Sequence, residues 1–92
     1  MFVAVAIHHP TSEHVEDFAA YMLRVRAAVG APPGLIRFDC WREPDGGRLF
    51  GLSVWESQEA FEAALPLIGS LRHEHLPEWD ARADDVLLGI PL

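Results

Sequence analysis

The sequence is poor in residues that mark several classes of protein. Among its 92 residues there is one cysteine, Cys40, and no lysine. A single cysteine excludes an internal disulfide and is typical of the reducing cytoplasm. No apolar run approaches the roughly 20 residues that cross a bilayer, and the apolar stretch 2–7 is too short for a secretory signal. We therefore expect a cytoplasmic protein without a membrane partner.

Positive charge is also scarce. Fourteen acidic residues stand against seven arginines, and the formal net charge is −7. Such a surface repels phosphate backbones and anionic lipid headgroups. The charge balance therefore predicts that nucleic acid is not a partner.

Half of the residues are apolar, which is enough for a core in one domain that spans residues 1–92. A domain of this length buries only roughly 60–65% of its unfolded surface. Self-association would add burial, so we expect a homodimer.

The hydrophobic pattern predicts four strands and two helices. Apolar alternation indicates strands over 2–8, 35–42, 48–55 and 86–90, with 77–85 as a loop. The first helix is expected to start after Thr11 or Ser12 and to end at Gly30, and Ser57 is the expected N-cap of the second. The second helix has the apolar stripe Phe61, Ala64, Leu65 and Ile68, and Pro66 is expected to kink or end it.

The stretch 44–47, Pro-Asp-Gly-Gly, predicts a hairpin whose glycine accepts a positive φ. The resulting order, β-α-β-β-α-β, predicts a ferredoxin-like α+β fold with an antiparallel sheet and both helices on one face.

The two sides of each strand differ in polarity. We expect the uniformly apolar sets to lie under the helices: Val3, Val5 and Ile7; Ile36, Phe38 and Cys40; Phe50, Leu52 and Val54. The uncovered face would then collect Ala4, Ala6, His8, Arg37, Asp39, Trp41, Gly51, Ser53 and Trp55. This mixed face is too apolar to be left exposed to water, and we expect it to pack against the same face of a second copy of the chain. It would enclose either a ligand cavity or an interface filled by side chains.

Two families share this topology. RNA-recognition domains carry a basic-Gly-aromatic signature on the third strand. Leu49, Leu52 and Ser53 depart from that signature, and the acid excess also opposes RNA.

The second family fits better. Strand 48–55 runs into Trp55-Glu56-Ser57 and then Phe61, Gly34 opens the preceding strand, and His73 and His75 follow the second helix. Over nearly the whole chain this pattern resembles the antibiotic biosynthesis monooxygenase family of dimeric α+β barrels. The resemblance implies two protomers whose sheets form a barrel, with a pocket in each. Members include cofactor-independent oxygenases of polycyclic phenols, haem-degrading oxygenases and quinol oxygenases.

The haem-degrading branch uses an asparagine on the first strand, the third-strand tryptophan and a histidine near the second helix. By resemblance, Trp55 matches the tryptophan, and His73 or His75 lies close to the histidine position. The first strand offers no asparagine over 3–6. This departure opposes haem degradation and leaves haem binding open.

Several side chains are candidates for chemistry, each with a plainer alternative. His8 could accept a phenolic proton, or it is a surface histidine before a turn. Arg37 could stabilise a phenolate or a superoxide-like anion with Asp39 orienting it, or the two form an ion pair at a dimer seam. Trp41 and Trp55 could stack on a planar ligand, or they pack at an edge or interface.

His73 and His75 cannot share one face of a helix, so at most one faces the pocket. No third ligand has diagnostic spacing from them, so we expect no metal site.

The leading hypothesis is a monooxygenase that needs no bound cofactor and acts on a small aromatic or phenolic substrate. His8 or His75 would deprotonate the phenol, the anion would react with O2, and Arg37 would stabilise negative charge. The remaining predicted contacts to substrate are Trp41, Trp55, Asp39, Ser53 and His73. Two alternatives stay open: a non-catalytic dimeric binding or interaction module, and a haem-binding or haem-degrading relative.

Overall fold

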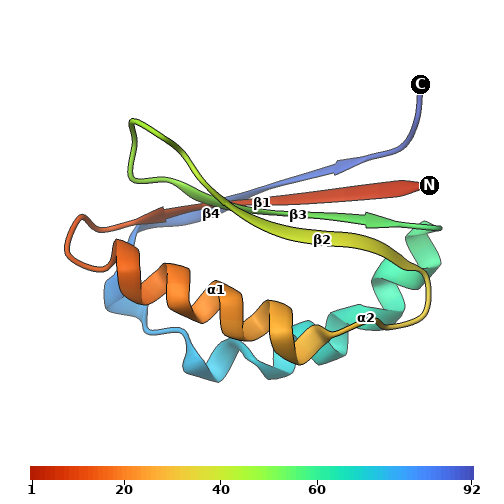
Figure 1. Ribbon diagram of the computed structural model, residues 1–92, viewed down its shortest axis with the longest axis horizontal. Helices are drawn as coiled ribbons and strands as arrows, with labels where there is room; N and C mark the ends of the chain where they lie inside the picture. Colours follow the sequence, from red (N-terminus) through yellow and green to blue (C-terminus); the bar gives the residue numbers. More distant parts are fainter.

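The computed structural model describes residues 1–92 as one antiparallel sheet with two helices on the same face (Figure 1). The strands are β1 (Phe2–Pro10), β2 (Leu35–Arg42), β3 (Leu49–Trp55) and β4 (Asp80–Gly89), and the helices are α1 (Val15–Val29) and α2 (Gln58–Ser70). The strand order is β2-β3-β1-β4, with every neighbouring pair antiparallel. The predicted ferredoxin-like α+β fold is confirmed. None of the helices combines the length and the apolarity that a bilayer crossing requires.

Helix α1 starts later and ends where expected. It begins at Val15, because His14 takes the N-cap position and neither Thr11 nor Ser12 serves as a cap. At the other end, Gly30 adopts φ 63° and donates its N–H to the Arg26 carbonyl. A positive φ suits glycine, so the chain leaves the helix there with little strain.

Helix α2 begins with the predicted cap. The Ser57 hydroxyl accepts a hydrogen bond from the Ala60 N–H at 3.1 Å. The helix does not end at Pro66 and continues to Ser70. Leu65 was expected in the buried stripe but is exposed, whereas its neighbour Ala64 is buried.

The β2–β3 hairpin forms without the expected backbone conformation. Glu43 N–H donates to the Arg48 carbonyl at 3.0 Å and closes the turn. Neither Gly46 nor Gly47 has a positive φ, since the positive values in this chain belong to Gly30 and Gly34. The prediction of a hairpin is therefore confirmed, and its proposed turn geometry is wrong.

Strand β4 is longer than predicted. The stretch 80–85 was expected to be loop, yet it pairs with β1 through Pro10↔Asp80, His9↔Arg82 and Ile7↔Asp85. Its charged residues concealed the strand in the sequence, and charge is a common feature of exposed edge strands. Between α2 and β4 the chain forms two short 3-10 turns, η1 (Arg72–Glu74) and η2 (Pro77–Trp79).

The side of the sheet that the helices cover differs from the prediction for β1 and β3. Phe2, Ala4 and Trp55 pack with Ala64 of α2 in one buried cluster. Leu49 packs with Phe18, Met22 and Trp79 in a second cluster. Thus the set with large rings and small residues lies under the helices, and the uniformly apolar set of these two strands lies on the open side.

Small residues explain this choice. Ala4 pairs with Ser53, and Ala6 pairs with Gly51, so the side chains in the middle of the covered face are small. Small side chains at the centre of this face leave room for helix side chains, while large rings fill the space at the two ends of the sheet. Apolar content is a poor guide to the covered side here, because both sides of β3 contain large apolar residues.

From Arg37 onward, the residues of strand β2 face the sides that were predicted for them. A register shift between Leu35 and Arg37 places Leu35 beneath the helices and Arg37 on the opposite side. Cys40 packs against the α1 cluster as expected. Ile36 lies at the irregularity and is 54% exposed, so its predicted place in the core is wrong.

The open face of the sheet is therefore more apolar than the sequence suggested. No element covers it (Figure 1). By strand register it carries Val3, Val5, Ile7, Arg37, Asp39, Trp41, Phe50, Leu52 and Val54. An antiparallel sheet that faces water normally alternates with polar residues on that side. This face instead has the composition of one that is buried against another surface.

Candidate functional site

The predicted site residues lie in separate places rather than in one pocket. His8 and His75 each pack against Phe18, at one end of the sheet. Trp55 and Ser53 lie in the buried cluster at the other end. Three further residues, Arg37, Asp39 and Trp41, are on the open face. A single chain therefore does not bring these residues to one ligand.

His8 comes from β1, a central strand, and its ring faces α1. The ring centroids of His8 and Phe18 are 4.8 Å apart. His8 Nδ1 lies 3.0 Å from Asp84 Oδ1, and both side chains are mostly buried. The angles of this contact fall outside hydrogen-bond geometry, so Nδ1 is shielded from water without a well-formed bond.

His75 is the histidine of the second region that faces inward. Its Nε2 lies 3.1 Å from Asp80 Oδ1. Its ring packs against Phe18, Tyr21 and Trp79, with centroid distances of 5.2, 5.8 and 5.7 Å. His75 thus forms a second histidine–carboxylate pair on the same aromatic surface as His8.

His73 points away from this surface. Its Nδ1 contacts the Ser70 carbonyl at 2.9 Å in an exposed position. Of the two histidines only His75 packs against these rings, and the chain turns between them at η1. His73 has no contact with the other candidate residues.

We use the name aromatic site for the group that surrounds Phe18, with these members: His8, Phe18, Tyr21, His75, Trp79, Asp80 and Asp84. Phe18 is 1% exposed and Trp79 is 7% exposed, so the rings form a continuous buried surface. Both carboxylates and Trp79 are absent from the site predicted from sequence, because the charged stretch 77–85 has the composition of a loop. A strand over 80–89 would have put Asp80 and Asp84 on one side.

Tyr21 is a further titratable group of the aromatic site. Burial raises the pKa of its phenol, and the charges of Glu74 and Asp84 raise it further, while Arg72 and Arg24 act in the opposite direction. The hydroxyl therefore stays protonated and able to donate a hydrogen bond throughout the neutral range.

Trp55 is a core residue. Its side chain is 0% exposed, and its Nε1–H donates to the Ser53 hydroxyl at 2.9 Å. Ser53 Oγ in turn lies 3.5 Å from the Ala4 carbonyl. The rings of Trp55 and Phe61 meet edge-on at 5.8 Å. The prediction that Trp55 and Ser53 lie on the uncovered face is wrong, since both are packed under α2.

Arg37, Asp39 and Trp41 lie on the open face as predicted. Arg37 pairs with Asp39, and Arg26 of α1 approaches the same carboxylate at 3.9 Å. Trp41 stacks on Phe50, with 6.5 Å between ring centroids and 14° between ring planes, and is 48% exposed. The sheet separates Arg37 from His8, so the predicted joint action on one anion does not occur within one chain.

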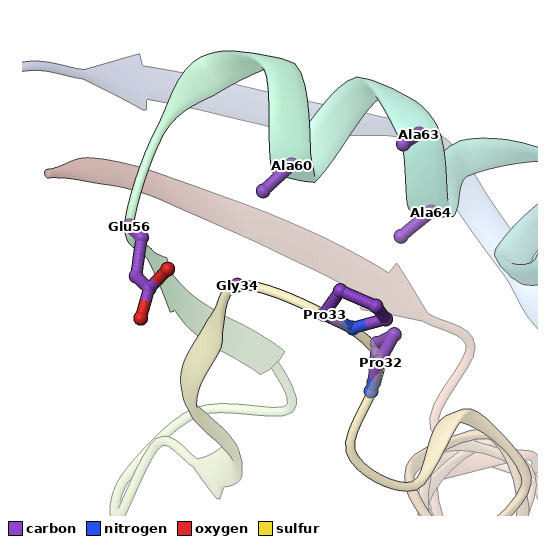
Figure 2. A pocket seen from close by; sticks show the side chains of 7 residues that line it. All are labelled: Pro32, Pro33, Gly34, Glu56, Ala60, Ala63 and Ala64. Atoms are coloured by element: carbon purple, nitrogen blue, oxygen red, sulfur yellow. The ribbon is translucent and has the colours of Figure 1, made fainter.

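Two shallow cavities lie elsewhere. The larger, about 280 Å³, is drawn in Figure 2, where the alanines of α2 face the loop before β2. It is lined by Pro32, Pro33, Gly34, Glu56, Ala60, Ala63 and Ala64. The smaller, about 150 Å³, lies between α1 and β2 and is lined by Ala19, Met22, Leu23, Cys40, Trp41, Arg42 and Leu49.

Neither cavity has the chemistry of a reaction site. The first has one carboxylate among small apolar side chains, and the second has no acid or histidine. Both are smaller than the roughly 300–1,000 Å³ typical of ligand pockets. No group of three or more histidine, cysteine or carboxylate side chains is placed to hold a metal ion. The aromatic site therefore remains the place where titratable groups and ring surfaces coincide.

Comparison with known proteins identifies the relatives of this chain. The model of the antibiotic biosynthesis monooxygenase family matches residues 1–66. No curated protein sequence matches the chain.

Solved structures share the whole fold. A candidate antibiotic biosynthesis monooxygenase from Nitrosomonas europaea is 17% identical, with a TM-score of 0.88 over 100% of this chain and 99% of its own. Rv0793 from Mycobacterium tuberculosis is 20% identical, with a TM-score of 0.84 over 99% and 94%. The R26S mutant of MhuD, solved with two manganese protoporphyrin IX molecules per active site, is 20% identical, with a TM-score of 0.79 over 100% and 95%.

Proposed function

Because the chain belongs to the antibiotic biosynthesis monooxygenase family, we propose that it oxygenates a small planar phenol at the aromatic site without a bound cofactor. One observation carries this proposal: two histidine–carboxylate pairs, His8–Asp84 and His75–Asp80, border the same buried ring, Phe18. A base beside an aromatic surface is what phenol deprotonation needs.

The proposed reaction converts a phenol and O2 into a quinone and water. The base takes the hydroxyl proton, and the electron-rich phenolate passes electrons to O2. One oxygen atom then bonds to the ring carbon opposite the phenolic oxygen, and that carbon loses its hydrogen. The other oxygen atom leaves as water. The substrate loses four electrons and O2 gains four, so no external reductant is required.

We assign the role of base to His8. It projects from β1, where it pairs with Leu49 of β3, whereas His75 lies in a connection. Catalytic groups on regular elements keep their positions more precisely than groups on loops. Asp84 would hold the ring and stabilise the imidazolium that forms. Tyr21 would donate a hydrogen bond to the phenolate oxygen, and the rings of Phe18 and Trp79 would pack on the substrate.

We further propose that the active form is a homodimer joined through the open face. Its apolar residues and the exposed Trp41 support this assembly. Arg37 and Asp39 would then lie at the seam as an ion pair, in place of the catalytic role expected from sequence.

Haem does not fit the aromatic site in this conformation. The Nε2 atom of His75, the only inward-facing histidine near α2, already contacts Asp80 at 3.1 Å, and its ring is packed against three other rings. Neither cavity described above contains a histidine. We therefore derive no step through haem.

The deciding experiment replaces His8. His8→Gln keeps a side chain of similar size and removes the base, so phenol-dependent O2 consumption should fall by roughly 10²–10⁴-fold. His14→Gln is the matched control, because His14 also pairs with an aspartate, Asp17 at 2.9 Å, but lies at the exposed start of α1. Equal activity of the two variants would refute the assignment of His8.

One observation favours a second candidate function, a non-catalytic binding module. In this conformation the rings of the aromatic site fill the space that a substrate ring would need. A module of this kind would bind planar phenols without consuming O2. Calorimetric binding together with an oxygen electrode distinguishes the two functions.

A further inference from the structure

The connection between α2 and β4 covers the aromatic site. We use the name strap for residues 71–78 of this connection. Figure 1 shows the chain leaving α2 and passing α1 before it enters β4. Contacts of His75 with Phe18 and Tyr21, and of Glu74 with Arg24, place the strap against α1.

The backbone of the strap bonds almost entirely to itself and its neighbours in sequence. Leu71 N–H donates to Ile68, Glu74 N–H to Leu71 and His75 N–H to Arg72, all three to carbonyls nearby in the chain. The long-range bond of the connection lies just beyond the strap, where Thr11 N–H donates to the Trp79 carbonyl at 2.7 Å. The strap can therefore leave α1 without breaking a sheet or helix ladder.

Side chains hold the strap in place, and most of them are accessible to water. Arg24 and Glu74 form an ion pair at 3.2 Å with 51% and 35% of the side chains exposed. Such exposed pairs contribute little to stability. His75 and Asp80 are more buried but still reach solvent. Trp79, by contrast, is buried in the core cluster and fixes the end of the strap.

Phe18 is the reason that the strap must move. Its ring is 1% exposed, and His75 covers it on the side of the strap. A planar ligand cannot stack on Phe18 and reach His8 while the ring of His75 occupies that surface.

We propose that the strap is a gate: it swings away about Ser70 and Trp79, lifts His75 off Phe18 and Tyr21, and admits a planar phenol to the exposed ring surface. This inference rests on the proposed function and deepens it, because it gives the two histidines different tasks. His8 stays on the sheet as the base, and His75 moves with the gate and closes over the bound ring. Segments with few long-range backbone bonds commonly open at lower free energy than the whole domain.

Cross-linking tests the gate. In a Cys40→Ser background, Arg24→Cys and Glu74→Cys are joined by a short bifunctional maleimide whose linker contains a reducible disulfide. 2-Naphthol serves as the probe for binding and for O2 consumption. Joining the pair should slow naphthol association and turnover at least about tenfold, and reduction of the linker should restore both.

A matched control joins another exposed arginine–glutamate contact that does not involve the strap. Glu16 of α1 and Arg42 of β2 are 2.6 Å apart, and Glu16→Cys with Arg42→Cys in the same background accepts the same reagent. This cross-link should leave association and turnover unchanged. Equal rates in the joined and reduced forms of the Arg24–Glu74 pair would overturn the gate.

Hydrogen exchange separates failure of the gate from failure of the proposed function. Amides of the strap should exchange at least about tenfold faster than those of β1, and the Arg24–Glu74 cross-link should slow them. If no phenol is bound or oxidised but this pattern appears, the proposed function fails and the gate stands. If strap amides exchange only at the rate of global unfolding, the gate is wrong whether or not turnover occurs.

Discussion

The indole of Trp55 donates its Nε1–H to the hydroxyl of Ser53, two residues earlier on β3, at 2.9 Å. Both side chains therefore point to the same side of the strand, and that side is the one that α2 covers. The bond satisfies the polar atom of a ring that is 0% exposed. Within one chain, the tryptophan of the family motif is thus a part of the core and has no open space beside it.

Replacing this tryptophan should damage the fold more than the chemistry. Trp55→Ala removes a fully buried ring, and such changes cost about 3–5 kcal/mol. That is a large fraction of the roughly 5–15 kcal/mol that stabilises a small domain. Urea denaturation should show a much lower midpoint. Trp41→Ala is the control, since Trp41 is 48% exposed and should change the stability of the chain itself far less.

A charge on the open face should separate the proposed dimer without unfolding the chain. Leu52 lies on that face opposite Val5, so Leu52→Glu would place a carboxylate in the interface. Light scattering after size exclusion should report a monomer. Leu65→Glu on the exposed side of α2 adds the same charge and should leave the assembly intact. A dimer that survives Leu52→Glu would contradict the proposed interface.

The phenol of Tyr21 should lose its proton at a higher pH than an ordinary tyrosine, and this titration should lower the stability of the folded chain. Burial raises its pKa above the ordinary value of 10.0, so the folded chain holds the phenolic proton more tightly than the unfolded chain does. This contribution to stability is present below pH 10 and is lost as the pH rises through the raised pKa. Tyr21 is the only tyrosine, so tyrosinate absorbance follows it directly. Tyr21→Phe should remove the tyrosine-dependent part of the alkaline loss.

Haemin should produce no Soret shift when it is added to the protein. The expected reason is chemical: His75 Nε2 contacts Asp80 at 3.1 Å, and His73 points away. A His75→Ala variant provides the comparison. A shift in the native chain that disappears in this variant would show that His75 binds haem iron.

Much of the fold followed from local sequence. The bounds of β2 were predicted to the residue, and Ser57 and Gly30 act at the helix ends as their chemistry requires. Alternation also fixed which residues of β1 and β3 share a side. It could not decide which side the helices cover, because both sides of these strands are apolar enough to be buried.

The candidate site was predictable only in fragments. His8 and His75 were identified from the sequence, but Asp80, Asp84 and Trp79 fell in a stretch whose charges resemble a loop. The pairing of 80–89 with β1 is a long-range contact, and no local pattern specifies it. The separation of Arg37 from the histidines depends on a register shift in β2, which is equally invisible in the sequence.

The sequence by itself determined the order of elements, the family resemblance and the acidic charge, because these depend on local propensity and composition. Only the tertiary structure decided which side of the sheet the helices cover, the burial of Trp55 and the packing of His8 and His75 against Phe18. The physical reason is that the helices pack best on the side whose centre has the small side chains of alanine, glycine and serine. Which side this is depends on all four strands together, so no single segment of sequence specifies it.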